Sequence, residues 1–345
     1  MRKWMLGICA AFLILGGTGC QKEEKPTAQE TKPAQPAKKP EKKEEKKEHL
    51  NIFPLTGLKT KKPNDARVYS VMVNNHERAR PQSGLHKADL VYEVLAEGNI
   101  TRFLAVFQSE QPKVIGPVRS ARDYFIELSQ GYHSFYVHHG WSPDAKRILS
   151  GKNSKVDSLN GLYYDGTLFH RATFRQAPHN SYITYEDLMT GLKKKGYDDK
   201  DKIKPLPFLK PKEIKGLSGD KADQVLITYS QNETVGFNYN PSTKRYARSS
   251  DGTPTTDLET KTPIEVNNVF IVEMKHKIID SYGRRAIDLT SGGKGLLIQQ
   301  GKVREVTWKN KDGRIIPSGT GFVPGKTWIN IIPTQPGISK SVSIE

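Results

Sequence analysis

The sequence predicts an α+β protein in which a mixed α/β domain is followed by a mainly antiparallel β domain. Up to about residue 200, short apolar segments of strand type alternate with segments that have helical spacing and helix caps. From Asp223 onward the pattern changes to short strand-like segments with no comparable long helix between them. Turn signals such as Asn240-Pro241, Asp251-Gly252 and Asp312-Gly313 separate these segments.

The predicted N-terminal domain spans residues 51–200. Its strands are assigned to apolar and β-branched runs, and its helices to places where a capping residue or a proline precedes apolar residues at helical spacing. The strands are expected at residues 68–73, 89–97, 103–107, 114–118 and 133–139, and the helices at residues 120–130, 143–149 and 184–195.

A stretch rich in Lys, Pro and Gly, residues 201–221, is predicted to link the two domains across the surface. The β-rich domain then spans residues 222–345. Within it, Gln300-Gly301 is typical of a hairpin turn, and Trp308 and Trp328 are expected to pack in the core of the sheet. Its strands are expected at residues 225–229, 235–239, 244–247, 266–274, 295–299, 303–308 and 327–332.

The first fifty residues predict where the protein works. A positive start is followed by an apolar segment, residues 4–15, that is short for a membrane span, and then by Gly-Gly-Thr-Gly before Cys20. This order resembles a bacterial lipobox, although Gly17 stands where that pattern prefers Leu, and it makes residues 1–20 a lipoprotein signal peptide with Cys20 as the lipidation site. An uncleaved anchor and a plain secretory signal are the alternatives. Residues 21–50 are almost wholly Lys, Glu, Pro, Ala, Gln and Thr, a composition typical of a disordered tether.

The expected location is therefore the extracytoplasmic face of the cell membrane, held by a lipid anchor. Of the formal net charge of +17, about +13 lies on residues 51–345, so the folded part is itself basic. Such a surface suits an anionic envelope ligand or an acidic protein partner, while export makes nucleic acid an unlikely partner. Ordinary solubility of a protein near an anionic surface explains the charge equally well. Both cysteines, Cys9 and Cys20, precede the tether, which leaves no disulfide framework for the folded part.

A pocket for an anion is predicted between residues 98 and 123. Arg102 lies at the start of a buried strand, and Arg119 and Arg122 lie where a helix is expected to begin. Guanidinium groups beside a helix N-terminus favour negative charge, because free backbone N–H groups already do so there. Each arginine taken alone is more often a solvated charge, so the prediction depends on the three as a set.

Further candidates for ligand binding surround these arginines in the sequence. Asn75 follows a strand, Arg80 lies in a Pro/Gly loop, and Glu93 is either an orienting partner for an arginine of the pocket or a solvated carboxylate. His138 and His139 point to opposite faces of one strand, which argues against a two-histidine metal clip but leaves His139 free to line the pocket. A second basic cluster contributes Arg171, His179 and Asn180. The sequence has no phosphate loop, nucleophile elbow, His-Glu-x-x-His helix or EF-hand loop, so neither a cofactor nor a metal is predicted.

Two segments carry a family resemblance: NNHERARPQSGLHKADLVYEVLAEGNITRFLAVF from Asn74 onward, and IGPVRSARDYF from Ile115 onward. They resemble the YerB-like lipoproteins of Gram-positive bacteria, and the resemblance extends over about residues 53–333, including a second conserved half after Asp223. It implies a membrane-attached lipoprotein of two domains. The domain of that family is catalogued as being of unknown function, so no reaction is implied.

Three functions are compatible with these observations. The first is a binding module with an Arg-lined pocket for an envelope ligand or protein partner. The second is an envelope enzyme that acts on a lipid-linked phosphate or glycan, in which Arg102, Arg119 and Arg122 neutralise phosphate charge and Asp123 or Glu93 places a metal or acts as base. The order of these segments is weakly similar to LytR-CpsA-Psr phosphotransferases, although their motif is not matched residue by residue. The third is a scaffold whose β domain docks other envelope proteins.

Overall fold

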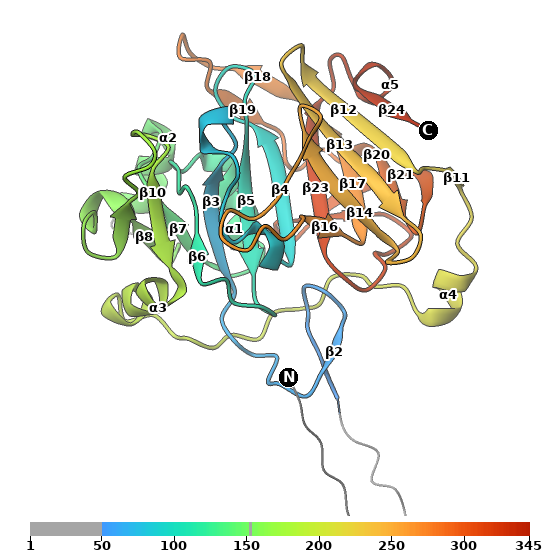
Figure 1. The fold of residues 1–345 in the computed structure, drawn as a ribbon. Helices are drawn as coiled ribbons and strands as arrows, with labels where there is room; N and C mark the ends of the chain where they lie inside the picture. Colours follow the sequence, from blue (N-terminus) through green and yellow to red (C-terminus); the bar gives the residue numbers. More distant parts are fainter. Residues whose placement is uncertain (1–49, 152–153) are drawn as a thin grey trace, which may run out of the picture. The chain divides into compact units, whose positions relative to one another are not determined.

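An eleven-stranded mixed sheet contains strands from both halves of the chain (Figure 1). The computed structural model describes residues 50–151 and 154–345; the predicted signal peptide, Cys20 and all but the last residue of the predicted tether lie outside them. The neighbouring strands of this sheet are, in spatial order, β11 (Asp220–Lys221), β21 (Lys302–Lys311), β20 (Gly293–Gln299), β17 (Asn268–Met274), β23 (Thr327–Pro333), β4 (Leu90–Leu95), β5 (Thr101–Phe107), β3 (Tyr69–Asn74), β7 (Phe135–His138) and β8 (Ser158–Asn160), with β22 (Arg314–Pro317) paired to β21.

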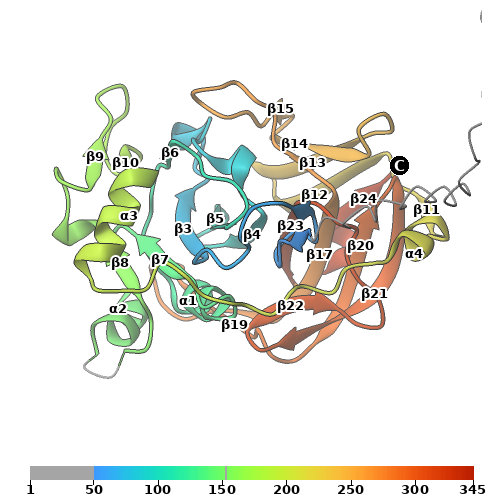
Figure 2. The ribbon, with the colours of Figure 1, turned by 90° about the horizontal axis from the view of Figure 1, so that it is seen from below.

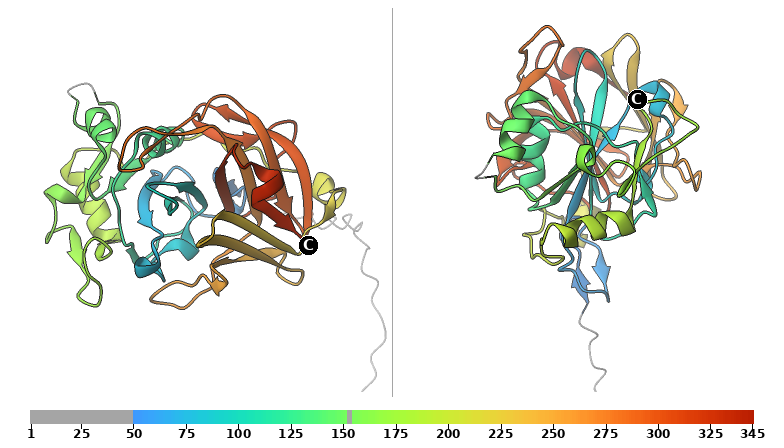
Figure 3. Two further views of the ribbon diagram at one scale, coloured as in Figure 1. Left: turned by 90° about the horizontal axis from the view of Figure 1, so that it is seen from above. Right: turned by 90° about the vertical axis from the view of Figure 1, so that its left-hand side faces the viewer.

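The two halves meet where β23 pairs with β4 in parallel, with Ile329 opposite Tyr92. Figure 2 shows β3, β5, β4, β23, β17, β20 and β21 following one another across the molecule, and Figure 3 shows the blue to green strands beside the orange and red ones. The predicted class, α+β with a mainly antiparallel C-terminal part, is confirmed. Backbone hydrogen bonds join β4 of the N-terminal half to β23 of the C-terminal half. Residues 201–221 therefore connect two stretches of sequence that contribute strands to the same sheet.

A second sheet belongs to the C-terminal half alone. It has six strands, ordered β15 (Thr253–Pro254), β14 (Arg245–Ser250), β13 (Glu233–Asn240), β12 (Gln224–Ser230) and β24 (Val342–Ile344), with β16 (Glu265–Val266) paired to β14. Three small sheets complete the strands: β1 (Asn51–Ile52) with β2 (Lys59–Thr60), β6 (Val114–Ile115) with β10 (Ser181–Thr184) and β9 (Phe169–Arg171), and β18 (His276–Ile278) with β19 (Arg285–Ile287).

The helices are short and lie mostly in the N-terminal half: α1 (Asp123–Gln130), α2 (Pro143–Ser150), α3 (Tyr185–Lys194), α4 (Pro211–Lys215) and α5 (Ile338–Ser341), with 3-10 turns η1 (Glu77–Ala79), η2 (Leu85–Lys87) and η3 (Gly161–Tyr163). Thr184 caps α3 as predicted, since its side chain accepts the N–H of Asp187. The predicted start of α1 at residue 120 is wrong by three residues. Arg119 N donates to Met72 O and Ala121 N to Gly140 O, and these bonds hold the chain extended until Arg122.

Alternate residues of the central strands enter two different cores. On β5, Phe103, Ala105 and Phe107 pack in a core shared with β12, β13 and β14, whereas Leu104 and Val106 pack in a core shared with α1. Both faces of the sheet are therefore covered, which explains why residues 103–107 form an unbroken apolar run.

Two predicted features of the C-terminal half are confirmed, the hairpin turn and the burial of both tryptophans. β20 and β21 form a hairpin whose turn residues, Gln300 and Gly301, have φ of 56° and 73°, values that suit a tight primed turn. Trp308 and Trp328 are both buried.

Among the described residues, no helix has the length and apolar character needed to cross a membrane.

Candidate functional site

The three predicted arginines gather around one carboxylate, Glu97, which follows β4. Arg102 Nη2 lies 2.9 Å from Glu97 Oε2, and Arg122 forms an ion pair with Glu97 Oε1. Arg102 is almost fully buried, and its Nη1 also donates to Ser120 O at 3.0 Å. Burial, together with the positive charges of Arg122 and Arg119, lowers the pKa of Arg102 to about 10. Two guanidinium groups thus share one carboxylate, and with Arg119 nearby this part of the protein keeps an excess of positive charge.

Arg119 is the member of this cluster that is not bound by an acid. In the described part of the chain it makes no ion pair; its Nη1 donates to Pro178 O at 3.3 Å, and its buried Nε has no hydrogen-bond partner. A buried N–H without an acceptor is unfavourable, because the cost of removing it from water is not repaid. Arg119 is therefore the arginine best placed to receive an anion.

Two histidines lie beside Arg119, His76 after β3 and His179 in the loop before β10. Their rings stack with centroids 4.5 Å apart. The backbone N–H of His76 donates to Asn74 Oδ1, so the Asn74 amide nitrogen must face His179 and donate to its Nδ1 at 2.9 Å. The N–H of Arg78 donates to His76 Nδ1 in the same way. Both neutral rings consequently carry their proton on Nε2, where neither makes a hydrogen bond within residues 50–151 and 154–345.

The environment lowers the pKa of both imidazoles, which disfavours their protonated forms. Burial lowers the pKa of His179, and the neighbouring His76, Arg119 and Arg78 lower it further. Burial also lowers the pKa of His76, where Glu77 opposes the shift and Arg78 and Arg119 add to it. A bound anion would reverse these shifts, because it would stabilise the protonated rings.

Of the predicted second cluster, Arg171 and Asn180 lie together with His139, whereas His179 lies apart from them beside His76. Arg171 Nη2 lies 3.0 Å from His139 Nε2, and Arg171 Nη1 donates to Asn180 Oδ1 at 3.1 Å. Asp165 binds the same guanidinium through both oxygens, while His139 Nδ1 lies 2.8 Å from Ser181 Oγ. The pKa of His139 is lowered by burial and then by Arg171, with a smaller contribution from Arg119. The arginine of this cluster is already neutralised by Asp165.

Asn75, Arg80 and Glu93 lie in a separate network between the two halves of the chain. Glu93 is fully buried and binds Arg248 of β14 through both oxygens, with Nη2 at 2.8 and 3.0 Å. The indole N–H of Trp328 also donates to Glu93, at 2.8 Å. The interpretation of Glu93 as a solvated carboxylate is wrong. It does orient an arginine, but that arginine is Arg248 of the C-terminal half.

A second carboxylate, Glu233, extends this network toward the surface. Thr101 Oγ1 lies 2.9 Å from Glu93 Oε1 and 3.1 Å from Glu233 Oε1, so one hydroxyl bridges the two acids. Arg80 binds Glu233 at 3.0 Å and also pairs with Asp251. Burial raises the pKa of Glu233 to about 7; Arg80 opposes the shift, and the charge of Glu93 supports it.

The predicted residues therefore fall into three groups: Arg102, Arg119 and Arg122 with His179; His139 with Arg171 and Asn180; and Asn75 with Arg80 and Glu93. The sequence reasoning did not select Glu97, His76 or Arg248. His76 could have been found, since it directly follows the polar end of β3. No cluster of His, Cys, Asp or Glu that could hold a metal ion occurs among the described residues.

Comparison with known proteins identifies what this chain is similar to. Residues 55–198 match the "Protein of unknown function (DUF3048) N-terminal domain", and residues 225–329 match the corresponding C-terminal domain. The "Putative lipoprotein YerB" of Bacillus subtilis (strain 168) is 47% identical over 345 residues, which cover 96% of each chain. The crystal structure of the YerB protein from Bacillus subtilis superimposes with a TM-score of 0.78 at 49% identity, covering 86% of this chain and 99% of that one.

Proposed function

We propose that this chain, which belongs to the DUF3048 family together with the putative lipoprotein YerB, is a lipid-anchored extracytoplasmic protein. We propose further that it binds an anionic group of the cell envelope. The anchor would be attached at Cys20, outside the described residues. The observation that carries the proposal is Arg119. Among the described residues its guanidinium has no acidic partner, and it lies beside two imidazoles whose Nε2–H groups make no hydrogen bond there.

The chemistry of this group favours an oxyanion such as a phosphate or a carboxylate. Arg119, His76 and His179 all offer N–H donors, and the charges of Arg102 and Arg122 exceed what Glu97 neutralises. Guanidinium and imidazole donors match the oxygens of phosphate and carboxylate groups. The carboxylates of an acidic protein surface would accept hydrogen bonds from the same donors. Binding of a soluble, phosphate-bearing wall fragment would indicate an envelope ligand instead of an acidic protein.

Replacing Arg119 by Met is expected to weaken binding of inorganic sulfate or pyrophosphate by about tenfold or more, equivalent to about 1.4 kcal/mol. Isothermal titration of the purified full chain measures this loss. Arg147→Met is the matched control, because Arg147 is exposed on α2 and pairs with Asp144. Equal affinities for the wild type and both variants would contradict the proposal.

Binding of sulfate is expected to strengthen as the pH falls from about 7.5 to about 5.5. Sulfate keeps its charge over this range, so the change reports on the protein alone. The pKa values of His76 and His179 are lowered in the free protein, and an anion that binds their protonated forms raises them. NMR titration of the imidazole resonances measures both shifts. A double variant, His76→Gln with His179→Gln, should bind sulfate with little dependence on pH.

The stacked pair of histidines is also the observation that favours the alternative, an enzyme acting on a lipid-linked phosphate or glycan. An imidazole whose Nδ1 is released from its present hydrogen bond can transfer a proton, while nearby guanidinium groups stabilise the charge that develops on a phosphate. Incubation of the full chain with labelled lipid-linked precursors tests this role. Turnover by the wild type that is lost in the His179→Gln variant would establish that the protein is an enzyme. Binding without turnover would support the binding module.

A further inference from the structure

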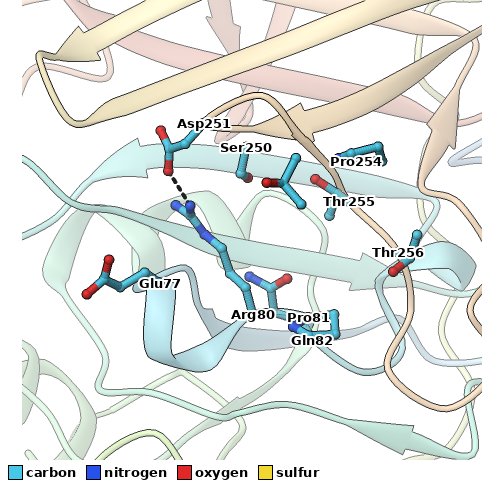
Figure 4. A pocket seen from close by; sticks show the side chains of 10 residues that line it. Glu77, Arg80, Pro81, Gln82, Ser250, Asp251, Pro254, Thr255 and Thr256 are labelled. Atoms are coloured by element: carbon cyan, nitrogen blue, oxygen red, sulfur yellow. Dashed lines mark hydrogen bonds and ion pairs between the residues drawn. The ribbon is translucent and has the colours of Figure 1, made fainter.

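A pocket of about 400 Å³ is lined by residues of both halves of the chain, among them Arg80, which belongs to the Glu93 and Glu233 network. Figure 4 shows Glu77, Arg80 and Gln82 of the N-terminal half on one side, and Ser250, Asp251 and Thr255 of the C-terminal half on the other. A cavity of this volume is within the range that holds small ligands. Its chemistry differs from that of the arginine cluster.

The main observation is a buried acceptor without a partner. Gln82 is only 1% exposed, and its Nε2 donates to Asn74 O at 3.0 Å and to Asn75 Oδ1 at 3.1 Å. The orientation of Asn75 is fixed in turn, because its Nδ2 faces Glu233 at 3.0 Å and Thr101 at 2.7 Å. Gln82 cannot flip without setting an oxygen against Asn74 O. Its Oε1 therefore remains a buried acceptor, and in the described residues no group donates to it.

The opposite wall offers hydroxyl groups with protons to donate. Ser250 Oγ accepts Arg248 Nη1 at 2.7 Å, and Thr255 Oγ1 accepts the same nitrogen at 2.8 Å. Because each oxygen uses a lone pair for this guanidinium, each O–H proton points elsewhere. Both hydroxyls can therefore donate to a carbonyl or hydroxyl oxygen of a ligand.

The charged groups of the pocket are mainly acidic, although the protein as a whole is basic. Glu77 is exposed at the rim and makes no side-chain hydrogen bond or ion pair with any other described residue. Asp251 and Glu233 both bind Arg80, which is the one cation among the described residues that line the pocket. An added anion would compete with two carboxylates for Arg80, whereas an added cation would meet Glu77 and Asp251.

We propose that this pocket binds a primary ammonium group carried by a small ligand, either a short peptide or an amino sugar. The ammonium donates to Gln82 Oε1, and the carboxylates of Glu77 and Asp251, which line the same pocket, favour its positive charge. The hydroxyls of Ser250 and Thr255 bind neighbouring oxygens of the ligand. The groups proposed to bind the ammonium are different from those proposed to bind the anion at Arg119, so either binding can be absent while the other is observed.

Isothermal titration of the purified full chain with lysinamide, glucosamine and their N-acetylated forms tests the proposal. We expect the free amines to bind and N-acetylation to weaken binding by about tenfold or more, because it removes the charge and two N–H donors. Tighter binding of lysinamide would identify a peptide ligand, and tighter binding of glucosamine an amino sugar; either supports the site. Equal binding of amines and N-acetylated forms, or no binding at about 10 mM, would overturn it.

Two variants connect the binding to this pocket. Gln82→Leu should reduce affinity for the amine by about tenfold, and Glu77→Gln by about threefold. Glu77→Gln keeps the test valid if Gln82→Leu does not fold, because the Glu77 side chain has no bond to lose. Glu186→Gln, at an exposed position on α3, is the matched control and should bind as the wild type does. An affinity of Glu77→Gln equal to that of Glu186→Gln would overturn the proposal.

Discussion

Replacing Arg248 by Met is expected to lower the free energy of unfolding by about 3–5 kcal/mol. The substitution leaves the carboxyl group of Glu93 fully buried without its guanidinium partner, and among the described residues Trp328, Thr101 and Asn75 remain as its donors. The guanidinium also lies 4.8 Å from the centroid of the Trp328 ring and 5.1 Å from that of Phe103, so packing between two aromatic rings is lost as well. Urea denaturation, with the midpoint compared at constant slope, measures the loss.

The double variant Glu93→Gln with Arg248→Met should recover part of this loss, because no uncompensated charge remains inside. Arg245→Met is the matched control: Arg245 lies on the same strand, β14, but it is half exposed and pairs with Glu265 at 3.6 Å. Its expected effect is within about 0.5 kcal/mol. A loss below about 1 kcal/mol for Arg248→Met would show that the buried pair does not hold the two halves together.

Local sequence signals were sufficient for most of the elements. The unbroken apolar run 103–107 became a strand buried on both faces, Thr184 became a helix cap, and Gln300-Gly301 became a hairpin turn. In each case the determining interaction lies within a few residues of the signal. Failures of the same kind were small, as at α1, where pairing of residues 119–121 with distant segments delayed the helix.

The partners of buried charges could not be predicted in this way. Glu93 and Arg248 are 155 positions apart, and they meet because the sheet that contains β14 packs against the sheet that contains β4, an arrangement that no spacing in the sequence reveals. Arg248 itself belongs to RYARSS, a segment that looks solvent-exposed by composition. Glu97 was likewise not selected from the sequence, although it is the carboxylate that binds both Arg102 and Arg122.

Glu233 is expected to make the stability of the protein fall as the pH rises from about 5 to about 8. The pKa of Glu233 is raised to about 7 by burial, with Glu93 and Asp251 adding to the shift and Arg80 opposing it. The folded state therefore keeps a proton that the unfolded state, with a pKa near 4.3, releases over most of this range. The stabilisation is complete below the unfolded pKa and is lost as the pH passes through the folded one.

The comparison of wild type with Glu233→Gln isolates this contribution, because other groups titrate equally in both. Asp89, for example, is fully buried with its pKa raised to about 6, and it adds a dependence of the same sign. Relative to the variant, the wild type should lose about 2 kcal/mol of unfolding free energy across the range. Urea denaturation at a series of pH values gives the two curves. If the two curves of unfolding free energy against pH are parallel, Glu233 has an ordinary pKa despite its burial. The attraction of Arg80 would then outweigh both desolvation and the repulsion from Glu93, which also binds Thr101.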